Sequence, residues 1–193
     1  MPQQADNIVT TIPDVQIAFV LACTQPASVS ACASKIAAVV DAVMHKGALG
    51  VDLDKVQLAL VGAEQEKQVF QSCSEIDRLL HRNPDGGLHV TPDNTRDISS
   101  LIHSAERLAW TAPTKLVVLF CDTAIVDDEH LEGSAFVMTC LGKKGVNVHF
   151  VELNESTASM MDVFYRSYSS SESSRFFMLT LEQEPSLFLP FRN

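Results

Sequence analysis

Short apolar segments with few charged residues recur along the chain, and longer segments with a different spacing of apolar residues separate them. The short segments are rich in β-branched and aromatic residues, which is typical of strands that a parallel sheet buries on both faces. We therefore expect each of them to form a buried strand. They span residues 15–22, 56–61, 116–121, 146–153 and 176–181.

In the segments between these strands, apolar residues return every three or four positions, as on one face of an α-helix. Ser28 or Ser30 would cap the first helix, and Gly47 follows its last turn. The fourth helix opens with the carboxylates of residues 127–129, which the helix dipole favours at an N-terminus. The apolar positions of the expected helices span residues 29–43, 73–80, 98–109, 131–141 and 160–165.

A shorter and more polar strand is expected at residues 67–71, and it would form an antiparallel hairpin with the second strand at the sheet edge. Residues 88–90 would add a minor strand. Strands that alternate with amphipathic helices indicate an α/β fold of three layers (αβα), in which helices cover both faces of a mostly parallel sheet. We expect one domain over residues 15–189, with tails at residues 1–14 and 190–193.

The composition is that of a globular domain, with 46% hydrophobic and 20% charged residues among 193. The chain has 14 basic and 24 acidic side chains, so its formal net charge is −10. An acidic surface repels phosphate backbones and anionic lipids, so we expect neither nucleic acid nor a membrane as a partner. No signal peptide and no apolar run of about 20 residues is evident, so we expect a cytoplasmic and nuclear protein.

The side chains that usually carry catalysis show no recognisable arrangement. The five cysteines form no CxxC pair, which indicates reduced thiols in an intracellular protein. Glycine-rich phosphate loops and the GxSxG nucleophile motif are absent, and the six histidines lack metal-ligand spacing. A nucleophilic role for Cys23 or Cys121 would require an adjacent base. We therefore expect no catalytic residue and no cofactor.

Ligands of such folds bind at the carboxyl ends of the strands, where the strand order reverses. Thr24 follows the first strand, and Asp122 follows the strand at residues 116–121. Two interpretations of Asp122 remain open, namely a cap for a neighbouring backbone segment and a ligand contact. An enzyme that uses Asp122 with Cys121 or Thr24 is the corresponding alternative to a binding protein.

Four segments resemble, in order, the elements of a von Willebrand factor A-type domain: VQIAFVLACTQPAS, VQLALVGAEQEKQVF, HVTPDNTRDISSLIHSAERLAW and KLVVLFCDT. In that family a DxSxS loop after the first strand, a loop threonine and a later aspartate form a metal site. The resemblance places Ala22, Thr24 and Pro26 at the three DxSxS positions, Thr91 or Thr95 at the loop threonine, and Asp122 at the aspartate.

The first carboxylate and the last hydroxyl of this metal loop are therefore missing. One carboxylate and two hydroxyls are too few for a hard divalent cation, which needs several convergent oxygens. The resemblance thus implies a domain without a metal-dependent adhesion site. Partner binding is expected at the carboxyl-end loops, around Thr24, Thr95 and Asp122.

The stretches LVVLFCDTAIVDDEHLEGSAFVMTCLGKKGVNVHFVELNE and SSRFFMLTLEQEPSLFL are most similar to family members that act as ubiquitin receptors in the proteasome regulatory particle. This likeness implies a non-enzymatic scaffold that binds lid and base subunits and supports ubiquitin-dependent degradation, with ubiquitin as an indirect partner. Those members carry ubiquitin-interacting helices after this domain, and the chain ends at Asn193 without one, so direct ubiquitin capture through such a helix is not expected. The alternative is an interaction subunit of another intracellular complex, such as a transcription or DNA-repair assembly.

Overall fold

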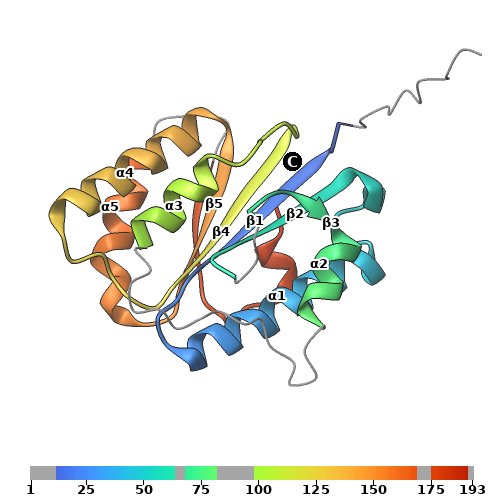
Figure 1. Ribbon diagram of the computed structural model, residues 1–193, viewed down its shortest axis with the longest axis horizontal. Coiled ribbons are helices and arrows are strands. Elements are labelled where there is room, and N and C mark those ends of the chain that lie inside the picture. The colour runs from blue at the N-terminus through green and yellow to red at the C-terminus, as the bar shows by residue number, and fades with distance from the viewer. Residues whose placement is uncertain (1–11, 64–67, 82–97, 169–174, 191–193) are drawn as a thin grey trace, which may run out of the picture.

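The computed structural model describes residues 12–63, 68–81, 98–168 and 175–190, and it places a six-stranded sheet between two layers of helices (Figure 1). The strands lie in the order β3-β2-β1-β4-β5-β6. All neighbouring pairs are parallel except β2 and β3, which are antiparallel at one edge. The strands are β1 (Val15–Ala22), β2 (Val56–Val61), β3 (Gln71–Ser72), β4 (Thr114–Cys121), β5 (Val146–Glu152) and β6 (Phe176–Leu179).

Helices follow most of the strands and cover both faces of the sheet, which confirms the expected three-layer α/β fold. α1 and α2 pack on one face, and α3, α4 and α5 pack on the other. The helices are α1 (Pro26–Lys46), α2 (Cys73–Leu80), α3 (Ile98–Glu106), α4 (Asp128–Lys143) and α5 (Ala158–Tyr168), with short 3-10 turns η1 (Leu53–Lys55), η2 (Glu155–Thr157) and η3 (Pro185–Phe188).

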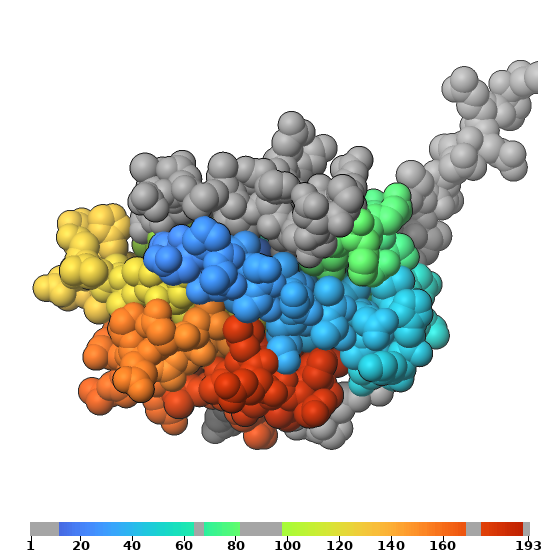
Figure 2. Space-filling model, turned by 90° about the horizontal axis from the view of Figure 1, so that it is seen from below, coloured from blue at the N-terminus to red at the C-terminus, as the bar shows by residue number. Residues whose placement is uncertain are grey.

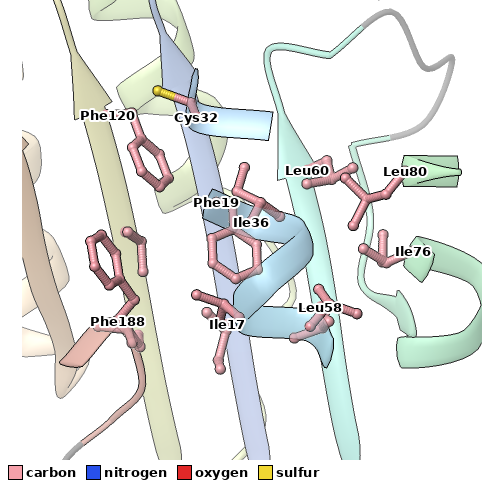
Figure 3. Packing of buried hydrophobic residues seen from close by; sticks show 14 of the residues in the cluster. Ile17, Phe19, Cys32, Ile36, Leu58, Leu60, Ile76, Leu80, Phe120 and Phe188 are labelled. Carbon is pink, nitrogen blue, oxygen red and sulfur yellow. The ribbon is translucent and has the colours of Figure 1, made fainter. Parts of the chain in front are cut away.

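Alternate residues of the central strand β1 supply the two hydrophobic cores. Ile17 and Phe19 belong to the core under α1 and α2, whereas Ala18 and Val20 belong to the core under the other three helices. Figure 3 shows Ile17 and Phe19 packed against Ile36 of α1. Because both faces are covered, β1 needs no polar residue on either side apart from its start, and its continuous apolar pattern follows.

α1 is long and apolar enough to cross a membrane, by length and composition alone. The sequence expectation missed this, because Lys35 and Asp41 interrupt the apolar run. Eight of its residues are buried in the core, in the pattern of a helix that covers a sheet. We therefore describe α1 as a core helix.

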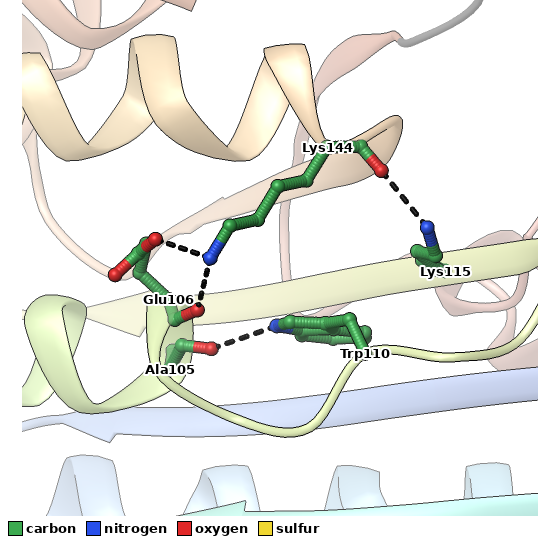
Figure 4. Close-up of polar contacts among 5 residues, drawn as sticks. All are labelled: Ala105, Glu106, Trp110, Lys115 and Lys144. Atoms are coloured by element: carbon green, nitrogen blue, oxygen red, sulfur yellow. Dashed lines mark hydrogen bonds and ion pairs between the residues drawn. The ribbon is translucent and has the colours of Figure 1, made fainter.

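Polar contacts at the amino ends of the strands explain why α3 stops at Glu106, although its predicted apolar stripe continues to Ala109. The indole Nε1 of Trp110 folds back and donates to the carbonyl oxygen of Ala105 at 3.0 Å (Figure 4). Lys144 Nζ donates to the carbonyl oxygen of Glu106 at 3.0 Å and pairs with its carboxylate. Lys115 Nζ donates to the carbonyl oxygen of Lys144 at 3.0 Å, so β4 and the ends of α3 and α4 are tied together.

The antiparallel edge strand lies at Gln71–Ser72 rather than at residues 67–71. Ser72 already serves as the N-cap of α2, because its hydroxyl accepts from the backbone N–H of Glu75 and the Glu75 carboxylate accepts from the Ser72 N–H. This capping box ends the strand. Of the rest of the predicted strand, residues 68–70 form no strand and residue 67 lies outside the described residues. The minor strand predicted at residues 88–90 also lies outside them.

The segment after β6 packs on the sheet. Phe188 of η3 is fully buried, and its ring stacks on that of Phe120 in β4 with centroids 6.2 Å apart. Lys35 of α1 donates to the carbonyl oxygen of Gln183 at 2.8 Å and lies over the Phe188 ring at 5.2 Å. The predicted domain limits at residues 15 and 189 remain a prediction.

Candidate functional site

The strand order reverses between β1 and β4, so the residues that follow these two strands meet at the carboxyl edge of the sheet. Ala22 of β1 lies opposite Cys121 of β4 in the parallel register. Thr24 and Asp122 follow these two strands, and they therefore lie close together. In Figure 2 the start of α1 (blue) lies beside the segment that leads into α4 (yellow).

Asp122 is 3% exposed, and hydrogen bonds converge on its carboxylate. The backbone N–H of Thr24 donates to Oδ1 at 2.8 Å and to Oδ2 at 3.0 Å. The backbone N–H of Gln25 donates to Oδ2 at 2.8 Å. The hydroxyls of Thr24 and Thr123 donate to Oδ1 at 3.2 and 3.0 Å. The charge of Asp122 is thus balanced by backbone and hydroxyl dipoles.

This carboxylate lies at the start of α1, where it accepts from the backbone N–H groups of the N-cap residue Gln25 and of Thr24 before it. α1 begins with Pro26, and Gln25 at the N-cap position makes no side-chain cap hydrogen bond. A negative charge beside the first backbone N–H groups of a helix satisfies donors and complements the helix dipole. Ser28 and Ser30 lie inside α1, so their prediction as caps was wrong. Of the two interpretations of Asp122, the geometry favours the cap.

Asn154 connects the end of β5 to the same cluster. Its Nδ2 donates to the backbone carbonyl oxygen of Asp122, and its Oδ1 accepts from the backbone N–H of Ser156 at 2.9 Å. The backbone N–H of Leu153 donates to the carbonyl oxygen of Cys121 at 3.2 Å. The carboxyl ends of three neighbouring strands are therefore joined by polar contacts around Asp122.

The thiols near this edge are buried. Cys23 Sγ lies 3.8 Å from Cys32 Sγ and 3.8 Å from the carbonyl oxygen of Phe120. The hydrogen bond with Cys32, together with burial, raises the pKa of the Cys23 thiol. Burial likewise raises the pKa of the Cys121 thiol. Neither sulfur is prepared to act as a thiolate nucleophile, which requires a lowered pKa.

The residues at the predicted metal positions do not fit a divalent cation. Ala22 is 1% exposed within the core and offers no side-chain oxygen, and Pro26 is occupied in opening α1. The Thr24 hydroxyl lies 2.9 Å from that of Thr123 and also bonds to Asp122. Among the described residues no group of three or more His, Cys, Asp or Glu side chains is arranged to hold a metal. A cation would have to displace the backbone donors from Asp122.

Two of the three predicted partner-binding residues, Thr24 and Asp122, are in direct contact. Thr95 and its alternative Thr91 lie outside the described residues. The role of all of them as partner contacts remains a prediction. Since Asp122 is nearly inaccessible, its contribution to binding would come from holding the loop and the start of α1 in place.

A hollow of about 670 Å³ lies at the opposite, amino end of the central strands. Gln16 and Gln57 form part of its wall, and Phe70 and Leu108 contribute apolar surface. The Gln16 amide donates to Gln57 Oε1 at 2.8 Å, and its oxygen accepts from the backbone N–H of Thr111 at 2.8 Å. These contacts satisfy the buried amide within the protein, so it is not directed at a ligand.

A second hollow, which the sequence reasoning missed, lies between α4 and α5. It measures about 560 Å³, and the 65% exposed side chain of Phe136 borders it. The available signal was that Phe136 falls outside the apolar stripe predicted for this helix. Which helix face stays uncovered depends on where α5 packs, and the spacing of apolar residues within α4 does not contain that information.

Comparison with known proteins gives a likeness in fold. No family model matches the chain, and a search of curated proteins finds no relative. Among solved structures the chain is similar to the SpRpn10 VWA domain, with 12% sequence identity and a TM-score of 0.54. The likeness covers 92% of this chain and 94% of that one. The chain therefore has the fold of a VWA-type domain.

Proposed function

We propose that the chain is a non-enzymatic interaction module that docks in the proteasome regulatory particle. It would contact lid and base subunits, help to join them, and support ubiquitin-dependent protein degradation. On this proposal the protein acts in the cytoplasm and nucleus, and it binds neither nucleic acid nor membranes directly.

The observation that carries the proposal is the closed state of the Asp122 site. In this position a VWA-type fold that binds through a metal would leave carboxylate oxygens open towards a cation. Here backbone N–H groups of Thr24 and Gln25 occupy both oxygens. The buried thiols of Cys23 and Cys121 have raised pKa values and supply no nucleophile. An edge built in this way supports structure, and function then rests on surface contacts with other proteins.

Two observations favour the proteasome over other assemblies. One of the solved structures to which the chain is similar is the SpRpn10 VWA domain. The resemblance to ubiquitin receptors of the regulatory particle includes KKGVNVHFVELNE, and this stretch forms the end of α4, the turn at Gly145 and β5. Sequence and fold thus favour the same kind of partner by separate arguments.

The test is purification of the tagged full-length chain from the cells that produce it, at moderate ionic strength. We expect lid and base subunits in the eluate, together with peptidase activity against a fluorogenic peptide. An untagged strain provides the control for non-specific recovery.

Absence of proteasome subunits and of peptidase activity would contradict the proposal. Recovery of a transcription or DNA-repair assembly instead would retain the interaction module and replace its partner.

A further inference from the structure

Phe136 is an exposed aromatic residue in the middle of α4. Its side chain is 65% exposed, although Ala135, Val137 and Met138 around it are buried. A single exposed apolar residue is common on protein surfaces. The exposure of Phe136 therefore indicates a binding surface only together with the shape and charge of the surface around it.

The surface beside Phe136 is hollowed along the line where α4 and α5 meet. Figure 2 shows these helices (yellow and orange) side by side at one end of the molecule. At the base of the hollow the hydroxyl of Thr139 donates to the carbonyl oxygen of Ser167 at 2.9 Å, which fixes the two helices to each other. The α4–α5 groove, as we call it, is lined by Asp128, Leu131, Glu132, Ala135, Phe136, Thr139, Val163 and Ser167.

The upper part of this groove is acidic. Asp128 and Glu132 both line it, and among the described residues no basic nitrogen lies within 4.0 Å of either carboxylate. The helix dipole accounts for Asp128, which lies in the first turn of α4. Glu132 lies one turn further along, where the dipole effect has faded, so its place on the groove calls for another reason.

The spacing of these side chains suits a helical ligand. Asp128 and Glu132 are four residues apart, or about 6 Å along the axis of α4, and the groove from Asp128 to Thr139 is about 16 Å long. A helix of about three turns with basic residues four positions apart would match both lengths. Grooves between helices commonly bind the apolar face of such a segment.

The negative charge of the groove argues against a second copy of this chain, nucleic acid or anionic lipid as its occupant. A second copy of this chain docked symmetrically would bring two acidic grooves together, at a cost in electrostatic repulsion. Nucleic acid and anionic lipid are repelled by the same carboxylates and by the net charge of −10. A basic protein segment is the occupant that the surface complements.

We propose that the α4–α5 groove binds a helix of a partner protein that places an apolar side chain on Phe136 and Lys or Arg residues opposite Asp128 and Glu132. This inference rests on the proposed function only in that the chain is an interaction module. It names a binding surface away from the carboxyl-edge loops around Asp122.

The test compares three forms of the tagged full-length chain, all expressed in its own cells. One carries Phe136→Ser, and one carries the charge reversal Asp128→Lys with Glu132→Lys. The matched control is Leu53→Ser, which removes a 41% exposed apolar side chain that belongs to η1, before β2, and lines neither of the two hollows. We expect at least tenfold less co-purified partner for the first two forms and a change within twofold for the control.

A photo-crosslinking amino acid at position 136 identifies what the groove touches. We expect a crosslinked peptide with an apolar residue and at least two Lys or Arg residues spaced for one helix face. A crosslink to a second copy of this chain, or to an acidic segment, would overturn the inference. So would full retention of the partner by Phe136→Ser or by the charge reversal.

The results separate this inference from the proposed function. Recovery of proteasome subunits by the wild type and by both groove variants alike would refute the groove and leave the proposed function standing. Loss of a different partner on Phe136→Ser would support the groove and refute the proteasome assignment. Thermal unfolding of each variant checks that folding is intact, and the charge reversal keeps the test valid if Phe136→Ser unfolds.

Discussion

At the scale of single residues, Asp122 shows how one side chain can serve distant backbone groups. Its carboxylate accepts from the backbone N–H groups of Thr24 and Gln25, which lie 98 and 97 residues away in the sequence. A buried carboxylate is stable only where hydrogen-bond donors replace its hydration. The bonds that keep the charge buried also hold the start of α1 against the end of β4.

We predict that Asp122→Asn lowers the free energy of unfolding by about 2–3 kcal/mol, because hydrogen bonds to a charged acceptor are lost and the new amide group faces backbone N–H donors. Urea denaturation measures the change. The control is Asp127→Asn, an exposed N-cap of α4 whose side chain accepts from the backbone N–H of His130 at 3.0 Å. Asn caps helices as well as Asp does, so this variant should change stability by less than about 0.5 kcal/mol.

If Asp122 instead bound a metal ion, added Mg²⁺ would stabilise the wild type. If the wild type bound Mg²⁺ with a Kd of about 0.1 mM, then 10 mM Mg²⁺ would stabilise it by about 2.7 kcal/mol. We expect no change in melting temperature on addition of Mg²⁺. An increase that disappears in Asp122→Asn would show that our description of this site is wrong.

His149 of β5 is another buried polar residue. It is 1% exposed, and its ring packs edge-on against Phe177 with centroids 5.5 Å apart. Burial lowers the pKa of His149 from 6.5 to about 4. Below pH 6.5 the unfolded chain therefore binds a proton that the folded chain does not bind until about pH 4.

The sign of this effect follows directly. Stability falls as the pH drops from 6.5 towards 4, and the loss due to His149 reaches about 2 kcal/mol at pH 5. We predict that His149→Leu removes this part of the acid destabilisation, as measured by urea denaturation at pH 7.5 and pH 5. His45→Gln, at an exposed site, should keep the wild-type loss. An equal loss in wild type and His149→Leu would contradict the assignment.

At the scale of elements, the close packing of α4 on α5 depends on Gly142. A Cβ atom at this position would lie 3.1 Å from the carbonyl oxygen of Tyr168 at the end of α5. Tyr168 itself is held in place, because its hydroxyl donates to the carbonyl oxygen of Val146 in β5. The absence of a side chain at Gly142 therefore sets the distance between the two helices near the end of the α4–α5 groove.

Gly133 of the same helix provides the comparison, because a Cβ atom there would meet no atom within 4 Å. We predict that Gly133→Ala raises the free energy of unfolding by about 0.5–1 kcal/mol through better helix propensity. Gly142→Ala should fall below Gly133→Ala by about 1 kcal/mol or more, since crowding of Tyr168 offsets the gain. Thermal or urea unfolding of both variants gives the difference, and equal gains would show that the interface can relax.

At the scale of the whole molecule, the segment after the last strand closes the core under α1. Phe188 is fully buried against Phe120, although it lies in a stretch with the Pro-rich, short-turn pattern of a tail. Phe136 has the same side chain and is 65% exposed. Replacing each of these two phenylalanines by alanine therefore compares the effect on stability of a buried and of an exposed ring.

We predict that Phe188→Ala costs about 3–5 kcal/mol, because it removes transfer free energy and leaves a cavity. Phe136→Ala should change stability by less than about 0.5 kcal/mol, because the ring is already hydrated. Denaturant midpoints for the two variants are measured side by side. A small effect of Phe188→Ala would mean that η3 does not stay on the sheet in solution.

Much of the fold could be predicted from the sequence. The strands at Val15–Ala22 and Val56–Val61 and the helix at Cys73–Leu80 have the predicted ends. These ends could be predicted because the spacing between apolar residues changes there within a few neighbouring positions of the sequence. Ends that depend on distant contacts were missed. α1 starts at Pro26, directly after the Gln25 N–H that Asp122 binds, and α3 stops at Glu106, where Trp110 folds back.

The pattern of apolar and polar residues was enough to predict the alternation of strands and helices, the two-sided burial of the sheet and the position of Asp122 after a central strand. The contacts of that carboxylate depend on the arrangement of the strands, because the order β2-β1-β4 brings Thr24 and Asp122 together across 98 residues of chain. The position of Phe136 at the border of a groove likewise depends on where α5 lies beside α4. The spacing of apolar residues along one helix or strand shows which face of that element can be buried. Which neighbouring element covers this face depends on the arrangement of the whole sheet.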